Sequence, residues 1–106
     1  MNYHPMSNNL DILNYLGLIK RARRLVTGES ALKAIQSKEA KFVIIAENAS
    51  DNTKKKFSDK CKYYQIDYQI WGHSDELSHA IGSHNRMVIA VVDKGFASKL
   101  KEKLGG

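Results

Sequence analysis

The sequence predicts an α/β protein, a three-layer α/β/α sandwich whose helices cover both faces of a central mixed sheet of about four strands. Helical and extended patterns alternate along the 106 residues, which is typical of helices packed around a sheet. Two of the extended segments, residues 41–46 and 87–92, are almost entirely apolar. Strands of this kind are buried on both faces, so helices are expected on each side of the sheet.

The chain is expected to open with an arm and a helix. Residues 1–8 carry no apolar pattern and are predicted to be a flexible arm before a single domain over residues 9–104. Asn8 or Asn9 caps a helix that extends to about Arg24, because leucine and isoleucine recur at helical spacing beyond these asparagines. Basic residues fill the last turns, where they complement the negative end of the helix dipole.

A short extended segment and a second helix follow. Thr27 is predicted to be the N-cap of this helix, and Ala31, Leu32 and Ile35 are predicted to form its buried stripe. The apolar run over residues 41–46 is the first buried strand.

The middle of the chain repeats this alternation. Ser50 or Asp51 opens a third helix over about residues 51–63, and most of the lysines of this segment fall on its outer face. Residues 66–70 alternate between apolar and polar side chains, which predicts a half-exposed strand.

The last third holds two more helices and a strand. Ser74 is predicted to cap a short helix, and Gly82 ends that helix in the left-handed conformation. The second buried strand covers residues 87–92. Asp93 or Lys94 starts the final helix.

The net charge of +6, from 17 Lys and Arg against 11 Asp and Glu, is spread over the chain. Residues 1–50 hold seven basic and four acidic residues and residues 51–106 hold ten and seven, so each half carries +3. Any basic surface is therefore assembled by folding. Such a charge favours a polyanionic partner, nucleic acid first, and a basic protein without such a partner is the alternative.

The sequence lacks the motifs of most catalysts and membrane proteins. It has no P-loop, no dinucleotide-binding glycine motif and no nucleophile elbow. Of the four histidines, His73 and His79 are six residues apart, which puts them on different faces of a helix rather than at the spacing of a metal-ligand pair. With these motifs absent, no enzyme activity, metal or cofactor is expected. The single cysteine, Cys61, is predicted to be a packing residue, with a thiol made reactive by nearby lysines as the alternative.

No apolar run approaches the ~20 residues of a membrane span, so a cytoplasmic protein without a membrane partner is expected.

Polar residues gather where the predicted elements end. The N-terminus of the second helix offers unpaired N–H groups beside Gly28, which permits close backbone approach. Glu29 and Lys33 lie one turn apart there and supply an acceptor and a donor for a base edge or a phosphate, or else form an ordinary surface ion pair. Two further groups flank the buried strands: Glu47 and Asn48 after the first, and Ser83, His84, Asn85 and Arg86 before the second.

Residues 25–50, LVTGESALKAIQSKEAKFVIIAENAS, resemble the core of the kink-turn-binding ribosomal proteins, the L-seven-Ae and L-thirty-e family. The segments NTKKK from Asn52, DKC from Asp59 and DKGFA from Asp93 resemble its small bacterial YlxQ-type branch more specifically. The similarity runs over residues 10–104, and the order and spacing of the segments are specific when taken together. The fold of the family is an α/β/α sandwich, in agreement with the pattern described above.

The resemblance implies an RNA-binding function. Members of the family bind kink-turns or related internal loops through the N-terminus of the second helix, the loop after the first long strand and the loop before the last strand. By position, these places correspond here to Thr27, Gly28, Glu29, Ser30 and Lys33; to Glu47 and Asn48; and to Ser83, His84, Asn85 and Arg86. The implied function is non-catalytic binding of structured RNA, ribosomal RNA first, by a monomer that associates with the ribosome or with translation proteins.

The chain departs from the family pattern within these places. Aligned on Lys33, the Gly-x-Asn-Glu-x-x-Lys signature of the family puts its Asn at Glu29 and its Glu at Ser30. An amide both donates and accepts hydrogen bonds whereas a carboxylate only accepts, so the preferred base edge is expected to differ from the usual one. The third loop is polar, and its Arg86 can stack on a base or hold a phosphate.

A second function class stays open. The same fold serves in the family as a protein–protein interaction module in ribonucleoprotein assemblies, and the altered signature is also consistent with loss of RNA binding. An exposed apolar patch in place of a basic rim would favour this alternative.

Overall fold

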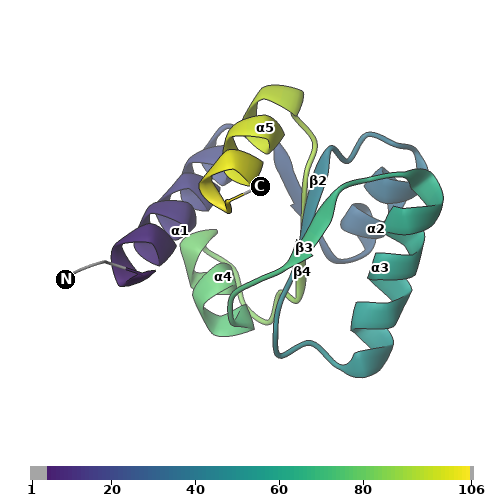
Figure 1. The fold of residues 1–106 in the computed structure, drawn as a ribbon, viewed down its shortest axis with the longest axis horizontal. Coiled ribbons are helices and arrows are strands. Elements are labelled where there is room, and N and C mark those ends of the chain that lie inside the picture. Colours follow the sequence, from purple (N-terminus) through teal and green to yellow (C-terminus); the bar gives the residue numbers. More distant parts are fainter. Residues whose placement is uncertain (1–4, 106) are drawn as a thin grey trace.

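The computed structural model describes residues 5–105, with side-chain surroundings from residue 9 onward, and it has the predicted three layers (Figure 1). The elements in chain order are α1 Pro5–Arg21, β1 Leu25–Thr27, α2 Gly28–Gln36, β2 Phe42–Ile45, α3 Asp51–Tyr64, β3 Tyr68–Ile70, α4 Ser74–Ala80, β4 Val88–Val91 and α5 Lys94–Lys103. This is the predicted order of helices and strands. No helix in the described part of the chain combines the length and the apolarity needed to cross a membrane.

The sheet is mixed, and its strands lie in the order β1-β4-β2-β3. β4 pairs antiparallel with both β1 and β2, while β2 pairs parallel with β3. Ile45 lies opposite both Val88 and Ile70, and Thr27 lies opposite Ile89. The ends of β1, β2 and β3 and the start of β4 are therefore at the same end of the sheet.

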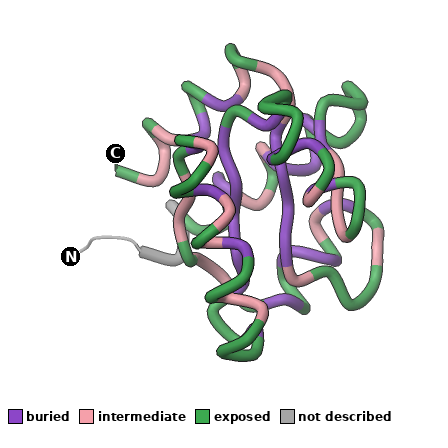
Figure 2. Tube along the Cα trace, turned by 90° about the vertical axis from the view of Figure 1, so that its right-hand side faces the viewer, coloured by how far each residue is buried: buried purple, intermediate pink, exposed green. Residues whose placement is uncertain are grey.

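The two central strands, β2 and β4, are buried along their whole length and separate two apolar cores (Figure 2). On one face, Phe42, Ile44 and Ile89 pack with side chains of α1, α4 and α5. On the other face, Val43 and Ile45 pack with side chains of α2 and α3. Successive residues of a strand point to opposite faces, so each central strand contributes to both cores. The prediction that helices cover both sides of the sheet is confirmed.

Helix α1 differs from the prediction at both ends. It begins at Pro5, before the predicted Asn8 or Asn9 cap, because the fixed φ of a proline suits a first helical position. Residues 5–8 of the predicted arm therefore belong to α1, and residues 1–4 of the arm lie outside the described residues. The helix ends at Arg21 rather than near Arg24, since the backbone turns into the left-handed region just beyond it, with a φ of 61° at Arg23.

Helix α4 is capped by a different residue from the one predicted. His73, not Ser74, is the N-cap, since its Nδ1 accepts a hydrogen bond from the Asp75 N–H at 3.2 Å. The Glu76 carboxylate completes a capping box by accepting a hydrogen bond from the His73 N–H at 3.5 Å. Ser74 is instead buried as the first helical residue, where both its hydroxyl and its N–H are bonded to Asn48.

The other predicted helix ends agree with the structure. Thr27, Ser50 and Asp93 occupy N-cap positions, and Gly82 follows α4 with a left-handed φ of 68°. The Ser50 and Asp93 side chains each accept a hydrogen bond from the backbone N–H three residues further on. Thr27 accepts no such bond. The first N–H groups of α2 are thus left without a side-chain cap from this residue.

Cys61 is a packing residue, as predicted. It is fully buried on α3 in the core that α2 and α3 form with the sheet. Burial raises the pKa of its thiol from 9.0 to about 11, because the charged thiolate is poorly solvated there. The lysines of α3 therefore do not activate it, and the reactive-thiol alternative is contradicted.

We expect Cys61 to resist alkylation while the protein is folded. The thiolate is the reactive form, and burial both disfavours it and blocks access, so iodoacetamide at neutral pH should react only when the fold opens. The rate of modification, followed by intact-protein mass spectrometry, measures this, with the urea-unfolded protein as the control. Equal rates for the folded and unfolded protein would show that the thiol is accessible.

Candidate functional site

The three groups of candidate residues lie at one end of the sheet. The N-terminus of α2 follows β1 there, residues 47–48 follow β2, and residues 83–86 lead into β4. The Ala46 N–H donates to the Met87 carbonyl at 2.8 Å, which joins the second group to the third. We call the surface formed by residues 27–30, 33, 47–48 and 83–86 the three-loop surface.

The first and third groups are in contact at Gly28. Gly28 has a φ of 57°, a backbone conformation that a side chain disfavours. A Cβ atom at this position would lie 3.3 Å from Nη1 of Arg86. The guanidinium of Arg86 therefore lies against the first residue of α2, and the absence of a side chain at Gly28 gives it room.

The loop that carries Arg86 is anchored by a buried serine. Ser78 is 3% exposed, and its hydroxyl accepts a hydrogen bond from the Arg86 N–H at 2.8 Å. The carbonyl of Ser78 accepts another from the Ser83 N–H at 2.8 Å. Both ends of the segment 83–86 are thus held by one residue of α4, while His84 and Asn85 between them are exposed.

Glu47 and Asn48 tie the loop after β2 to the β3–α4 connection. The Asn48 amide donates to the Ser74 hydroxyl at 2.9 Å and accepts from the Ser74 N–H at 2.8 Å. A Glu47 carboxylate oxygen accepts from the Gly72 N–H at 3.2 Å, and the Glu47 N–H donates to the Gly72 carbonyl at 2.7 Å. Both polar groups of the Asn48 side chain are therefore occupied within the protein, so this side chain positions the loop.

The remaining residues of α2 in the three-loop surface face the solvent. Glu29, Ser30 and Lys33 are all exposed. Among the ion pairs between described residues, none joins Glu29 to Lys33, so the ordinary surface ion pair is not formed. A carboxylate, a hydroxyl and an ammonium group are thus available beside the start of α2. The carboxylate accepts hydrogen bonds, the hydroxyl both donates and accepts them, and the ammonium group is a cationic donor.

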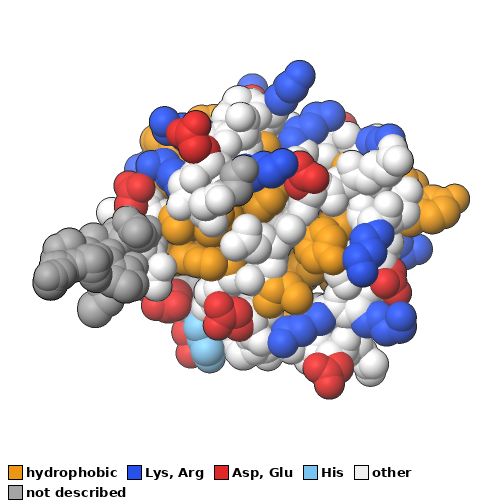
Figure 3. Space-filling model, in the orientation of Figure 1, with side chains coloured by type: hydrophobic (Ala, Val, Ile, Leu, Met, Phe, Trp, Pro, Cys, Tyr) orange, Lys and Arg blue, Asp and Glu red, His pale blue; other side chains and the backbone are white. Residues whose placement is uncertain are grey.

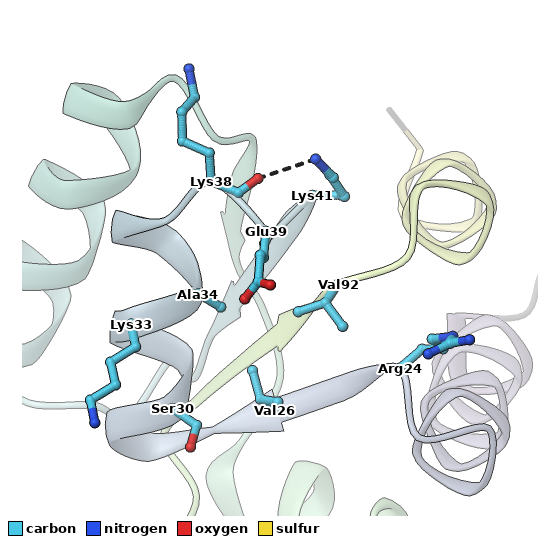
Figure 4. Close-up of a pocket in the computed structure, with 9 residues that line it drawn as sticks. All are labelled: Arg24, Val26, Ser30, Lys33, Ala34, Lys38, Glu39, Lys41 and Val92. Atoms are coloured by element: carbon cyan, nitrogen blue, oxygen red, sulfur yellow. Dashed lines mark hydrogen bonds between the residues drawn. The ribbon is translucent and has the colours of Figure 1, made fainter.

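Basic residues that sequence reasoning did not place in the site line a groove beside α2 (Figure 4). On the face seen in Figure 3, by contrast, Lys and Arg side chains are scattered among acidic ones. The groove has a volume of about 610 Å³. It is lined by Arg24, Val26, Ser30, Lys33, Ala34, Lys38, Glu39, Lys41 and Val92, and we call it the basic groove. Ser30 and Lys33 belong to both the basic groove and the three-loop surface.

Sequence reasoning also missed the two serines that hold the loops. Ser74, Ser78 and Ile81 recur at helical spacing on α4, so this pattern could have shown that both serines face the core. Within the described residues, no group of three His, Cys, Asp or Glu side chains is arranged to hold a metal ion.

The sequence matches the ribosomal protein L7Ae/L30e/S12e/Gadd45 family over residues 11–101. An RNA-binding protein YlxQ from Bacillus subtilis (strain 168) is 46% identical over 86 residues, which cover 80% of this chain and 86% of the relative. An RNA-binding protein YlxQ from Enterococcus faecium is 41% identical over 101 residues, which cover 93% and 96%.

Solved structures share the fold as well. A protein of unknown function from Bacillus halodurans C superposes with a TM-score of 0.85 at 44% identity, over 90% of this chain and 97% of that one. A Giardia lamblia 15.5kD RNA binding protein has a TM-score of 0.77 at 20% identity, over 99% and 91%. The second likeness concerns the fold alone.

We expect Asn48→Ala to destabilise the protein through the loss of both bonds to Ser74. The buried Ser74 groups would be left unpaired, so the free energy of unfolding should fall by about 1–3 kcal/mol. Asn52→Ala, at an exposed position of α3, is the matched control and should change it by less than about 0.5 kcal/mol. Urea denaturation followed by circular dichroism measures both. Equal effects of the two substitutions would contradict the positioning role of Asn48.

Proposed function

Because this chain belongs to the ribosomal protein L7Ae/L30e/S12e/Gadd45 family, we propose that it is a non-catalytic RNA-binding protein that recognises a structured internal loop with its three-loop surface. The observation that carries the proposal is the meeting of Arg86 and Gly28 at the start of α2, beside the exposed Lys33. The similarity to proteins named RNA-binding protein YlxQ over most of both chains supports the same function.

Each group on the three-loop surface has a chemical role in this proposal. The N–H groups at the start of α2 lie at the positive end of the helix dipole and suit a phosphate. Lys33 donates to a base edge or a phosphate, and Glu29 accepts from a base amino or imino group. Arg86 presents a planar guanidinium that stacks on an unpaired base or binds a phosphate with two hydrogen bonds. Internal loops display unstacked bases of this kind, whereas the bases of a regular RNA duplex are hard to reach.

We place the target among the internal loops of ribosomal RNA, kink-turns or related ones, and the protein in the cytoplasm as a monomer that associates with the ribosome. The name of the family and the net charge of +6 support a large structured RNA as the partner. Glu29 and Ser30 stand where the family signature has Asn and Glu. This difference supports a preference for an RNA loop other than the standard kink-turn.

A protein–protein module is less well supported. Among the residues whose side-chain surroundings the structure describes, the exposed large apolar ones are Leu10, Leu18, Tyr63 and Ile70. They belong to α1, α3 and β3, and none of them is part of the three-loop surface. The three-loop surface instead presents polar and charged side chains, as an RNA contact requires.

We expect Lys33→Ala to weaken binding to the cognate RNA by about 1–3 kcal/mol, the loss of one base-contacting side chain. Lys62→Ala, at an exposed position on the last turn of α3, is the matched control and should leave affinity nearly unchanged. Purified protein is titrated against ribosomal RNA fragments at two salt concentrations, because phosphate contacts depend on salt. If the Lys33 variant binds the best fragment as tightly as the wild type does, the three-loop surface is not the RNA contact.

We expect Glu29→Asn to shift preference toward a standard kink-turn. An amide restores a donor that the carboxylate lacks, so the ratio of affinities for a standard kink-turn and for the best native fragment should rise. Glu29→Gln has an amide on a longer side chain and controls for the loss of charge. The thermal midpoint should change little, because position 29 is exposed. An equal ratio for wild type and Glu29→Asn would show that this side chain does not read the base edge.

A further inference from the structure

The basic groove begins at the three-loop surface and leads away from it along the sheet. Ser30 and Lys33 line its first end, near the start of α2. Arg24 precedes β1 and Lys41 precedes β2, so both lie at the opposite end of the sheet from the three-loop surface. Lys38 lies just beyond the end of α2, in the connection to β2, and is next to Lys41 (Figure 4). The groove therefore spans the sheet from one end to the other beside α2.

The floor of the groove is apolar and its rim is cationic. Val26 and Val92 are half-buried and pack against the core under α2, and Ala34 lines the groove from α2 itself. Arg24, Lys33, Lys38 and Lys41 supply four positive charges around them. The Lys41 ammonium donates to the Lys38 carbonyl at 3.1 Å, which holds this charge at the rim.

Glu39 is the single carboxylate among the residues that line the groove. Figure 4 shows its side chain directed between α2 and Val92. Glu39 is exposed, and the one hydrogen bond of its carboxylate among the described residues is accepted from the Ser37 hydroxyl at 3.4 Å, so this side chain can turn outward when an anion approaches. Its charge opposes an anionic ligand as long as it stays in the groove.

We propose that the basic groove binds the backbone phosphates of the RNA strand that leaves the recognised internal loop. The proposal rests on the function proposed above and adds a second contact to it. Phosphates lie along the rim at Lys33, Lys38 and Lys41, while the sugars between them cover Val26 and Val92. Such contacts fix the path of the strand and add affinity without reading its sequence.

Continuity and charge favour RNA over an acidic peptide as the occupant. The groove shares Ser30 and Lys33 with the three-loop surface, so a strand bound at one is delivered to the other. Evenly spaced charges on a nucleic acid backbone also match cations that are spread along a rim rather than gathered at one point. An acidic peptide would bind the groove without any RNA on the three-loop surface. Binding of a peptide in the absence of RNA therefore distinguishes the two occupants.

The test compares two forms of the ribosomal RNA fragment that binds most tightly in the titration above. The short form keeps only the few base pairs that close the internal loop, and the long form keeps a full helical turn of flanking RNA. The variants are Lys38→Gln, Lys41→Gln and Glu39→Gln, with Lys62→Gln on α3 and Glu102→Gln on α5 as matched controls for the loss of one charge. All five positions are exposed, so the variants are expected to fold.

The expected result is an effect confined to the long RNA. Lys38→Gln and Lys41→Gln weaken its binding severalfold, and each lowers the slope of log affinity against log salt by about 0.7–0.9. Glu39→Gln strengthens its binding beyond the effect of Glu102→Gln. The short RNA binds all groove variants as it binds the charge controls.

Three outcomes would overturn the proposal. If the groove variants behave like their charge controls on the long RNA, the strand does not follow the groove, and the three-loop surface is left as the sole contact. If an oligoglutamate peptide binds the protein without RNA and Lys38→Gln weakens it while RNA length has no effect, the groove takes a peptide. If the wild type binds neither RNA form, the proposed function itself fails and the groove contact fails with it.

Discussion

The antiparallel pairing of β2 with β4 is the contact on which the rest of the molecule depends. Both strands are apolar on each face, so they cannot be stable without a helix layer on both sides. Their register sets Ile45 opposite Val88, which brings the end of one strand to the start of the other. The segments that follow β2 and precede β4 are adjacent for this reason, although they are far apart in the chain. The three-loop surface is thus a consequence of a buried register.

Sequence periodicity predicted the elements because each of them depends on local patterns and on burial. The apolar runs around Ile44 and Ile89 could only be central strands, and caps such as Ser50 and Asp93 act within a single turn. The misplaced cap of α4 has its cause in a contact between distant segments, whereas the two ends of α1 are set by local backbone geometry at Pro5 and Arg23. Ser74 has the residue type of a cap, but a bond to Asn48, 26 residues away, draws it into the interior. No local pattern reports such a partner.

The sequence predicted which residues form the candidate site, but not which of them face the solvent and which hold the loops in place. Asn48 belongs to the predicted group, yet both polar groups of its amide are hydrogen-bonded to Ser74, so this side chain holds its loop in position. Arg86 was predicted to stack on a base or to hold a phosphate, and the fold adds that its guanidinium lies against the start of α2. Lys38 and Lys41 were outside the prediction because they follow a helix and precede a strand, whereas the predicted site residues lie at the opposite ends of these elements. The basic side chains that line the basic groove come from separate segments of the chain, and they lie near one another only in the folded protein.

The contact between Gly28 and Arg86 has a consequence for how this protein can change over evolutionary time. Any residue larger than glycine at position 28 meets the guanidinium as well as an unfavourable backbone angle. The exposed Arg86 side chain can shift by the few tenths of an ångström that a Cβ atom at position 28 needs, whereas no change at position 86 relieves the backbone angle. The angle is therefore the stricter of the two constraints. Glycine is expected at position 28 in related chains even where position 86 has changed, so the partner can diverge through position 86 while position 28 stays fixed.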